Sequence, residues 1–246
     1  MSVARTFTFC LLFPTVFLLG CKKENSLDCV KSTGEIVTQI RPLPNFQTLR
    51  IFDNPEVIII ADSVPFVEVT AGKHLQENIQ TEVKNGELFL RNINKCNWIR
   101  SYKKPIRIKV HVPKLKDIFH DGDGTLSSEN LLPADTLFLH LTGAGDADLS
   151  LNTNLVWIDM YELAEARLHG KNRDLTAYIL SQGSLKASEL QNQNAYLKLS
   201  HQGQAFVEVS GLLKAEISGP GNVFYRNAPA QIQVTGPGPG EVKKLD

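Results

Sequence analysis

The chain has 246 residues, with 26 basic and 26 acidic side chains and a formal net charge of zero at pH 7. This balance, without a basic stripe, excludes nucleic acid as an expected partner. The length is sufficient for a substantial hydrophobic core in one or two structural units.

The first predicted element is a signal peptide over residues 1–20. A single basic residue, Arg5, precedes an apolar run from Phe7 to Leu19 that is too short to span a bilayer. The run ends Leu18-Leu19-Gly20-Cys21, which resembles the bacterial lipobox. We therefore expect lipidation at Cys21 and an anchor in the outer membrane, on either its periplasmic or its cell-surface face. An ordinary secretory signal is the alternative.

A lipidated Cys21 and a short polar tether occupy residues 21–28. Cys10 would leave with the signal peptide, so Cys29 and Cys96 remain as the other two cysteines. Two cysteines in an oxidising compartment favour a disulfide over a metal site or a nucleophile, and no Cys-x-x-Cys spacing is present. The sequence predicts a Cys29–Cys96 disulfide.

Residues 29–113 predict an N-terminal β region. Asn85-Gly86 is a hairpin turn signal, and His74–Ile79 is the one candidate helical turn. No linker rich in Gly, Ser or Pro divides the chain, and Pro113 is the nearest candidate boundary. The strand-like runs are Ile36–Ile40, Phe46–Ile51, Val57–Ile60, Phe66–Ala71, Leu88–Arg91 and Ile106–Val112.

Residues 114–246 carry a small-residue turn that recurs about every 20 residues. The markers are Gly124, Gly145, Glu165, Gly183, Gly203, Gly221 and Gly238, at spacings of 21, 20, 18, 20, 18 and 17 residues. A fixed period of this length is the signature of a repeat architecture. Glycine reaches positive φ without penalty and lets stacked corners approach at strand spacing.

Segments of alternating apolar and polar residues flank each marker, as in Ala195–Leu199. Aligning the repeats places an apolar column four residues before the marker, formed by His120, Leu141, Tyr161, Leu199, Ile217 and Val234. One period holds two or three short strands, which is enough for one coil of a β-solenoid. The predicted fold is an all-β solenoid in a single continuous body, with a hairpin sandwich as the alternative.

An acidic cluster is expected at two adjacent corners, formed by Asp121, Asp123, Asp146 and Asp148. Four carboxylates suit Ca²⁺, but aspartates are also common in solvated turns, and the repeat departs from the calcium-binding nonapeptide. We expect a surface cluster without a metal. His120 falls in the apolar column, which favours a buried wall residue.

Catalysis is the less favoured alternative. Asp159, Glu162, Glu165 and Arg167 lie close together in sequence and could supply an acid–base pair on one sheet. There is no Gly-x-Ser-x-Gly elbow and no Walker phosphate loop, so we expect neither an enzyme nor a cofactor.

Aromatic side chains on alternating strands can stack on sugar rings or on a partner, although such residues are more often core or cross-strand partners. The candidates are Trp98, Trp157, Tyr102, Tyr161, Tyr196, Phe224 and Tyr225. The C-terminal stretch Pro237–Lys244 predicts a cap that blocks further strand addition.

A family resemblance covers roughly residues 40–240. It rests on Leu75–Val83 leading to Gly86-Glu87-Leu88, on Ile106–Ile118, and on Gly143-Ala144-Gly145-Asp146-Ala147. These segments resemble the DUF2807 family of adhesin-like lipoproteins with a "head GIN domain", common among Bacteroidetes. The resemblance implies a right-handed β-helix-like fold and a cell-surface or periplasmic lipoprotein. The chain departs from the family pattern at Phe52–Pro55 and at Ala164-Glu165-Ala166.

Together these observations predict a lipid-anchored, non-enzymatic binding module of the cell envelope, whose partners are the membrane and a glycan or a host or matrix protein. A structural envelope protein without a ligand and a glycan-active enzyme are the alternatives. Binding predicts an exposed aromatic or charged patch on one sheet of the solenoid.

Overall fold

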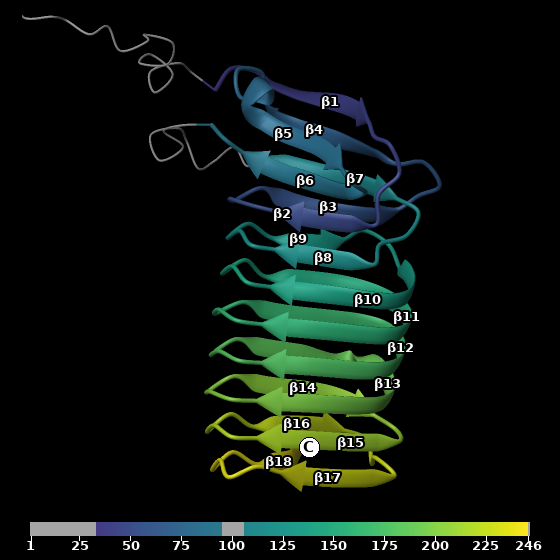
Figure 1. Ribbon diagram of the computed structural model, residues 1–246, viewed down its shortest axis with the longest axis vertical. Helices are drawn as coiled ribbons and strands as arrows, with labels where there is room; N and C mark the ends of the chain where they lie inside the picture. Colours follow the sequence, from purple (N-terminus) through teal and green to yellow (C-terminus); the bar gives the residue numbers. More distant parts are fainter. Residues whose placement is uncertain (1–32, 95–105, 246) are drawn as a thin grey trace, which may run out of the picture.

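A computed structural model describes residues 33–94 and 106–245 and has a tall stack of β-coils beneath a cluster of antiparallel strands (Figure 1). Its described residues form eighteen strands in one hydrogen-bonded sheet system and a single 3₁₀ turn, η1 (Gln76–Asn78). The all-β, solenoid-like prediction is confirmed. Within the described ranges, no helix is long and apolar enough to cross a membrane.

Each coil of the stack contributes one strand segment to each of two walls. In Figure 1 the arrows of successive segments, such as β8 and β9, point in opposite directions. The strands of the stack are β8 (Asp117–His120), β9 (Leu126–Ser128), β10 (Leu132–Leu141), β11 (Ala147–Met160), β12 (Glu165–Ile179), β13 (Ser184–Leu199), β14 (Gln204–Val209), β15 (Leu212–Ile217), β16 (Val223–Arg226), β17 (Gln231–Thr235) and β18 (Val242–Lys244).

We call the two walls the aromatic wall and the opposite wall. The aromatic wall holds β8, β15, β17 and the second halves of β10 to β13, paired in parallel from coil to coil. The opposite wall holds β9, β14, β16, β18 and the first halves of β11 to β13, also paired in parallel. The strands β11, β12 and β13 are long because each continues around the bend from the opposite wall to the aromatic wall.

The glycine corners join the end of each aromatic-wall segment to the next opposite-wall segment. A Cβ on Gly145 would lie 2.1 Å from the Gly124 carbonyl oxygen, and one on Gly221 would lie 2.0 Å from that of Gly203. Real Cβ atoms do not approach so closely, so the stack spacing itself requires glycine here.

Two of the predicted corner markers were wrong by one or two residues. Ala164, not Glu165, lies beneath Gly183, and Gly240, not Gly238, lies against Gly221. The column is therefore Gly124, Gly145, Ala164, Gly183, Gly203, Gly221 and Gly240, at spacings of 18 to 21 residues. The third corner carries a fully buried alanine, so glycine is required at individual corners such as Gly145 and Gly221 and not at every corner.

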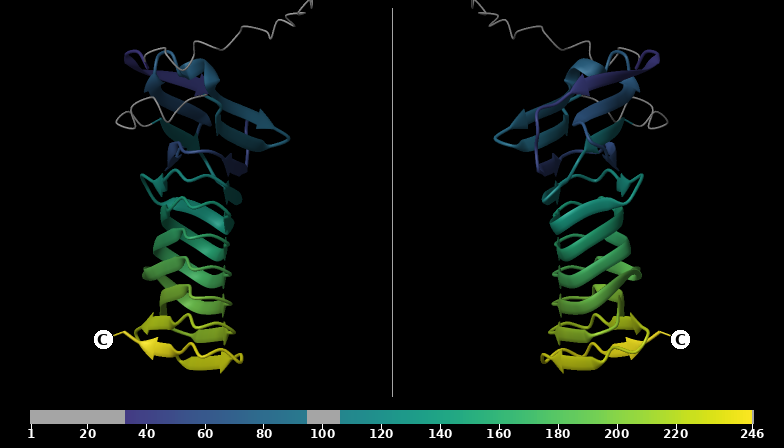
Figure 2. Two further views of the ribbon diagram at one scale, coloured as in Figure 1. Left: turned by 90° about the vertical axis from the view of Figure 1, so that its left-hand side faces the viewer. Right: turned by 90° about the vertical axis from the view of Figure 1, so that its right-hand side faces the viewer.

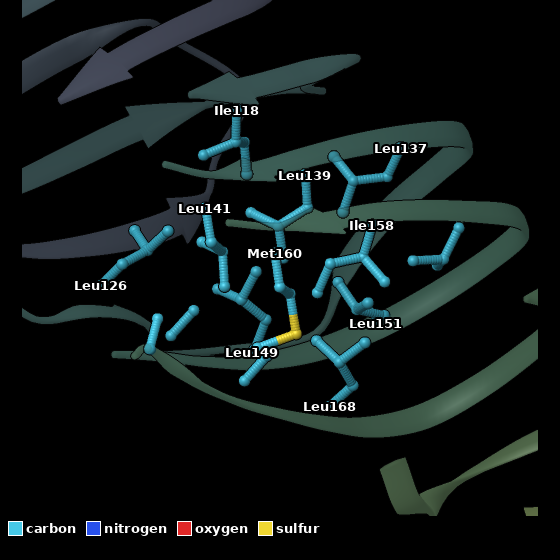
Figure 3. Close-up of a cluster of buried hydrophobic side chains, with 14 of the residues drawn as sticks. Ile118, Leu126, Leu137, Leu139, Leu141, Leu149, Leu151, Ile158, Met160 and Leu168 are labelled. Carbon is cyan, nitrogen blue, oxygen red and sulfur yellow. The ribbon is translucent and has the colours of Figure 1, made fainter. Parts of the chain in front are cut away.

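Buried aliphatic side chains from both walls fill the stack in continuous columns (Figure 3). The observed apolar column before the corners is His120, Leu141, Met160, Ile179, Leu199 and Ile217. The predicted members Tyr161 and Val234 are instead 50% and 53% exposed, because Tyr161 lies in a corner and Val234 in the last coil. Each coil from β8 to β15 thus buries one face of its strands against its neighbours, whereas β17 in the last coil is exposed.

A polar ladder lies inside the stack at the bends and was not predicted from the sequence. Thr153 Oγ1 donates to Asn172 Oδ1 (2.9 Å), and Asn172 Nδ2 donates to Asn192 Oδ1 (2.8 Å). Asn192 Nδ2 donates to the carbonyl oxygen of Leu190 (2.7 Å). All three side chains are buried, and these bonds satisfy amides that would otherwise be costly to bury.

The N-terminal region caps one end of the stack and contains the predicted strands and helical turn. Its elements are β1 (Ile36–Pro42), β2 (Thr48–Ile51), β3 (Glu56–Ala61), β4 (Phe66–Gly72), η1, β5 (Ile79–Lys84), β6 (Glu87–Asn92) and β7 (Arg107–Val112). The hairpin prediction is confirmed, because β5 and β6 pair antiparallel across Asn85-Gly86, both at positive φ. Strands β1, β4 and β7 also pair antiparallel.

The coils continue across Pro113 in an order that differs from the chain. Strand β2 lies between β6 and β8, and β3 lies between β7 and β9, all in parallel pairs. Leu49 and Ile118 thus share one column on both sides of residue 113. The two side views show these first coils directly above the later ones (Figure 2). At the other end of the stack, Pro237–Gly240 form the corner between β17 and β18.

Candidate binding face

The outward face of the aromatic wall, extended through β2 and β6, carries a row of aromatic rings on successive coils, interrupted by Arg50 between Phe89 and Phe119. Alternation along each strand turns one set of side chains into the core and the other outward, and the parallel register brings equivalent outward positions side by side. We call the row the aromatic ladder; it consists of Phe52, Phe89, Phe119, Phe138, His140, Trp157, Tyr178 and Tyr196, all half-buried.

Ring contacts link the ladder from coil to coil. Phe119 stacks on His140 with centroids 4.5 Å apart, and Trp157 stacks on Tyr178 at 5.1 Å. Tyr178 meets Tyr196 edge-on at 6.1 Å. Such offset and edge contacts are favourable beyond the area that they bury, so the rings hold each other in a fixed arrangement.

Cations lie over the ladder at both of its ends. The Arg91 guanidinium lies 3.9 Å above the Phe52 ring, and the Arg50 guanidinium lies 4.0 Å above Phe119. At the other end, Lys214 lies 5.4 Å from the Tyr196 centroid. These cation–π contacts place positive charge directly on an otherwise apolar row.

Carboxylates accept hydrogen bonds from the polar atoms of the ladder side chains. Asp159 accepts hydrogen bonds from His140 Nδ1 and from Trp157 Nε1, each at 3.0 Å. The indole and the imidazole are therefore both fixed by one carboxylate, while Trp157 stacks on Tyr178 and His140 stacks on Phe119.

A second carboxylate, Glu216, lies three coils further on and binds two aromatic-wall neighbours. It accepts from Tyr196 Oη (3.0 Å) and pairs with Lys198 Nζ (2.8 Å). The bond from Lys198 lowers the pKa of Glu216, and the bond to Glu216 raises the pKa of the Tyr196 hydroxyl. Tyr196 therefore stays neutral and donates to Glu216 through the neutral pH range.

This arrangement suits binding of a ligand that offers both flat apolar faces and hydroxyl or charged groups. Tyrosine and tryptophan present an apolar body with a polar edge, and long outward stripes of this kind are typical of recognition surfaces. Binding predicts an exposed aromatic or charged patch on one sheet; the ladder is an aromatic row on one wall, with its side chains half-buried.

The four aspartates of the predicted acidic cluster do not all lie together. Asp121 accepts a hydrogen bond from Thr142 Oγ1, and Asp146 accepts one from the backbone amide of Glu165 (2.8 Å). Asp148 points outward from the opposite wall and contacts His169 Nε2 at 3.0 Å. Among the described residues, no three His, Cys, Asp or Glu side chains converge as metal ligands.

His120 is a wall residue, as its place in the apolar column predicts. Its side chain is fully buried, Nε2 donates to the carbonyl oxygen of Gly124 (2.8 Å), and Nδ1 has no hydrogen-bond partner within the described structure. Burial lowers the pKa of His120, against the opposing effects of that hydrogen bond and of Asp121, Asp123 and Asp146. The neutral imidazole fills the space beneath the Gly145 corner.

The residues proposed for the enzymatic alternative are divided between the walls. Asp159 lies on the aromatic wall and holds His140 and Trp157. Glu165 lies on the opposite wall and pairs with Arg167 and Lys186. Glu162 is in the exposed corner between them. The structure therefore does not bring this set into one acid–base pair.

Of the aromatic candidates, Trp157 and Tyr196 belong to the ladder, whereas Phe224 lies on the opposite wall, stacked on Phe206. Tyr225 packs partly against the core. The predicted signal peptide, the lipid attachment at Cys21, the Cys29–Cys96 disulfide, and Trp98 and Tyr102 all lie outside the described residues.

A model of the DUF2807 family, described as "Putative auto-transporter adhesin, head GIN domain", matches residues 45–229. The chain belongs to this family. The resemblance drawn from the sequence motifs is confirmed, and the DUF2807 match spans both the N-terminal coils and most of the repeat stack.

Solved structures share the DUF2807 chain's fold over most of their length. A crystal structure of a putative adhesin from Bacteroides fragilis superposes with a TM-score of 0.78 at 21% identity, covering 86% of this chain and 97% of that one. A putative lipid binding protein from Parabacteroides distasonis gives 0.66 at 17%, covering 87% and 98%. A putative adhesin from Parabacteroides merdae gives 0.58 at 16%, covering 87% and 98%. A search of the curated proteins found no match.

Proposed function

We propose that this chain is a lipid-anchored, non-enzymatic protein of the bacterial cell surface that binds glycan chains along its aromatic ladder. The family's adhesin description supports a surface binding role. The lipobox-like segment ending at Cys21 supports an outer-membrane anchor. The ladder supports the choice of ligand class.

The single observation that carries the proposal is the row of aromatic rings on successive coils of one outward wall. Sugar rings present C–H groups beside hydroxyls, so they suit a surface where aromatic side chains alternate with hydrogen-bonding groups such as Asp159 and Glu216. The ladder runs along the stack from coil to coil, which suits an extended chain more than a compact ligand. Its rings are fixed by one another, so little freedom is lost on binding.

The test is a glycan and matrix-protein array probed with the chain from residue 22 onward, followed by titration of each ligand found. Trp157→Thr keeps strand propensity but removes the central ring, and we expect affinity to fall about tenfold. The matched control is Tyr161→Thr, which removes an exposed aromatic side chain in a corner outside the ladder.

Thermal unfolding of both variants establishes that the coils remain intact. Equal affinities of the folded Trp157→Thr variant and the parent would contradict the ladder as the binding surface. An array on which the folded parent binds nothing would instead favour a structural role in the envelope.

A further inference from the structure

The opposite wall contains a hollow that the ladder does not explain. It has a volume of about 490 Å³, within the range of about 300–1,000 Å³ usual for small-molecule sites, and lies over β12, β13, β14 and β16. The regular stack is interrupted here: the register of β13 against β14 shifts between Ala187 and Gln191. Bulges of this kind redirect side chains and often lie beside binding sites.

Three permanently charged cations line the hollow: Arg167, Lys186 and Arg226. Arg167 and Lys186 share one carboxylate, since the two oxygens of Glu165 pair with Arg167 and with Lys186 Nζ (2.6 Å). Arg226 is exposed and, within the described structure, has no ion-pair partner. Of these three side chains, Arg226 alone has no ion pair among the described residues, and Glu208 lies opposite it in the β14–β16 register.

Glu189 also lines the hollow, and its charge is directed to the His169 imidazole. His169 Nδ1 lies 3.1 Å from Glu189, and Nε2 lies 3.0 Å from Asp148 on the preceding coil. Within the described structure, Glu189 contacts His169 and forms an ion pair with none of the three basic side chains.

An aromatic surface lies beside these cations. Phe206 lines the hollow and stacks on Phe224 with centroids 4.8 Å apart and ring planes 12° apart. The stacking fixes the Phe206 ring on an outward strand position, where it offers an apolar face to a ligand.

We propose that this hollow binds an acidic sugar residue of a glycan chain. The guanidinium of Arg226 would receive the sugar carboxylate through paired N–H donors, supported by the charge of Arg167 and Lys186. The C–H face of the sugar ring would lie on Phe206. A free inorganic anion would leave the aromatic surface unused, and a neutral sugar would leave Arg226 unpaired. The ladder lies on the other wall, so this proposal does not rest on the function proposed above.

The probe is a hyaluronan hexasaccharide, in which glucuronate alternates with N-acetylglucosamine. A chitin hexasaccharide of the same length, built from N-acetylglucosamine alone, provides the neutral comparison. Phosphatidylglycerol vesicles represent the lipid source of an anionic group. Each is titrated calorimetrically into the chain from residue 22 onward.

We expect the hyaluronan hexasaccharide to bind and the chitin hexasaccharide to bind more weakly. Arg226→Gln should weaken hyaluronan binding about tenfold, because a charge-assisted bidentate contact is lost. Phe206→Thr should also weaken it. Arg107→Gln, which removes an arginine from the same wall in the N-terminal region, should leave it unchanged.

Equal binding of hyaluronan by the Arg226→Gln variant and the parent would overturn the proposal, as would equal binding of the two hexasaccharides by the parent. Failure of hyaluronan to bind the parent would also overturn it. Vesicle binding that depends on Arg226, without hexasaccharide binding, would assign the hollow to a lipid headgroup instead.

Discussion

The repeat stack and the N-terminal region bury similar side chains but are held together in different ways. In the stack from β8 to β18, each strand pairs in parallel with its equivalent one coil away, and the same small corner recurs. In the N-terminal region, β1, β4 and β7 pair antiparallel, and the β5–β6 hairpin closes one side. Stability is thus distributed over repeated contacts in one region and depends on individual contacts in the other.

The clearest individual contacts are the hydrogen bonds of the Arg41 guanidinium, which extends from β1. Its Nη1 donates to the carbonyl oxygen of Ile79 (2.6 Å), and its Nη2 donates to the carbonyl and side-chain oxygens of Gln76, both at 3.0 Å. Gln76 Nε2 in turn donates to the carbonyl oxygens of Val37 and Val69. Two side chains therefore join β1, β4, η1 and β5.

The largest expected effect comes from adding one methyl group at a corner of the stack. Gly145→Ala would place its Cβ 2.1 Å from the Gly124 carbonyl oxygen and 2.3 Å from His120 Nε2. Since backbone must move to relieve the overlap, we expect the free energy of unfolding to fall by about 3 kcal/mol. Chemical denaturation measures this.

The comparison in the N-terminal region is Gly86→Asn in the hairpin. A Cβ there meets nothing within 4 Å, and asparagine tolerates the positive φ of 78°. We expect a loss below about 1 kcal/mol. Equal losses of stability in the two variants would show that close corner stacking does not distinguish the repeat stack from the N-terminal region.

A smaller and more local effect is expected from Arg41→Met. Removing the guanidinium leaves carbonyl oxygens without donors, and we expect a loss of about 2 kcal/mol confined to the N-terminal region. Amide hydrogen exchange should quicken in β1 and β4 but not in β12. The control is Lys84→Met, which removes an exposed cation paired only with Glu82. Loss of protection in β12 as large as that in β1 would show that the two regions unfold as one unit.

The smallest effect concerns pH and the buried imidazole of the stack. Because burial lowers the pKa of His120 from its ordinary value of 6.5, the unfolded chain binds a proton at a higher pH than the folded chain does. The free energy of unfolding should therefore decrease as pH falls below about 6.5. The contribution of the neutral His120 to that free energy is fully present above this pH. His120→Leu should flatten the profile there. His201→Leu, at an exposed corner, should not; an unchanged slope in His120→Leu would exclude His120 as its source.

The sequence predicted the stack well because its signal is local and repeated. Alternating residues and corner glycines recur at near-constant spacing. The predicted corner positions Glu165 and Gly238 were wrong because the corners differ in length. Alignment to those markers also placed Tyr161 in the core in place of Met160. Aligning the repeats by their strand residues corrects this, since Leu141, Met160 and Ile179 are paired in register.

The order of the first coils was not predictable from the period. Strands β2 and β3 lie between strands that follow them in the chain, and no local pattern specifies such non-local parallel pairs. The antiparallel β5–β6 hairpin was predicted, because Asn85-Gly86 is a local signal.

The candidate site was only partly predicted. Trp157 and Tyr196 were singled out, but Phe119, Phe138 and Tyr178 were not. Alternate residues of a strand point inward or outward, and the composition does not show which of the two sets faces outward. The available signal was the register itself, which brings Phe138 beside Trp157. The bulge in β13 that opens the hollow left no comparable pattern.

Intrinsic fluorescence of Trp157 tests the ladder most directly. The chain has two tryptophans, so Trp98→Phe leaves Trp157 as the sole indole, stacked on Tyr178 in the middle of the ladder. Titration with a glycan that binds the parent should change its emission with the same midpoint as the binding isotherm. Saturable binding that leaves Trp157 emission unchanged would contradict the ladder as the binding surface.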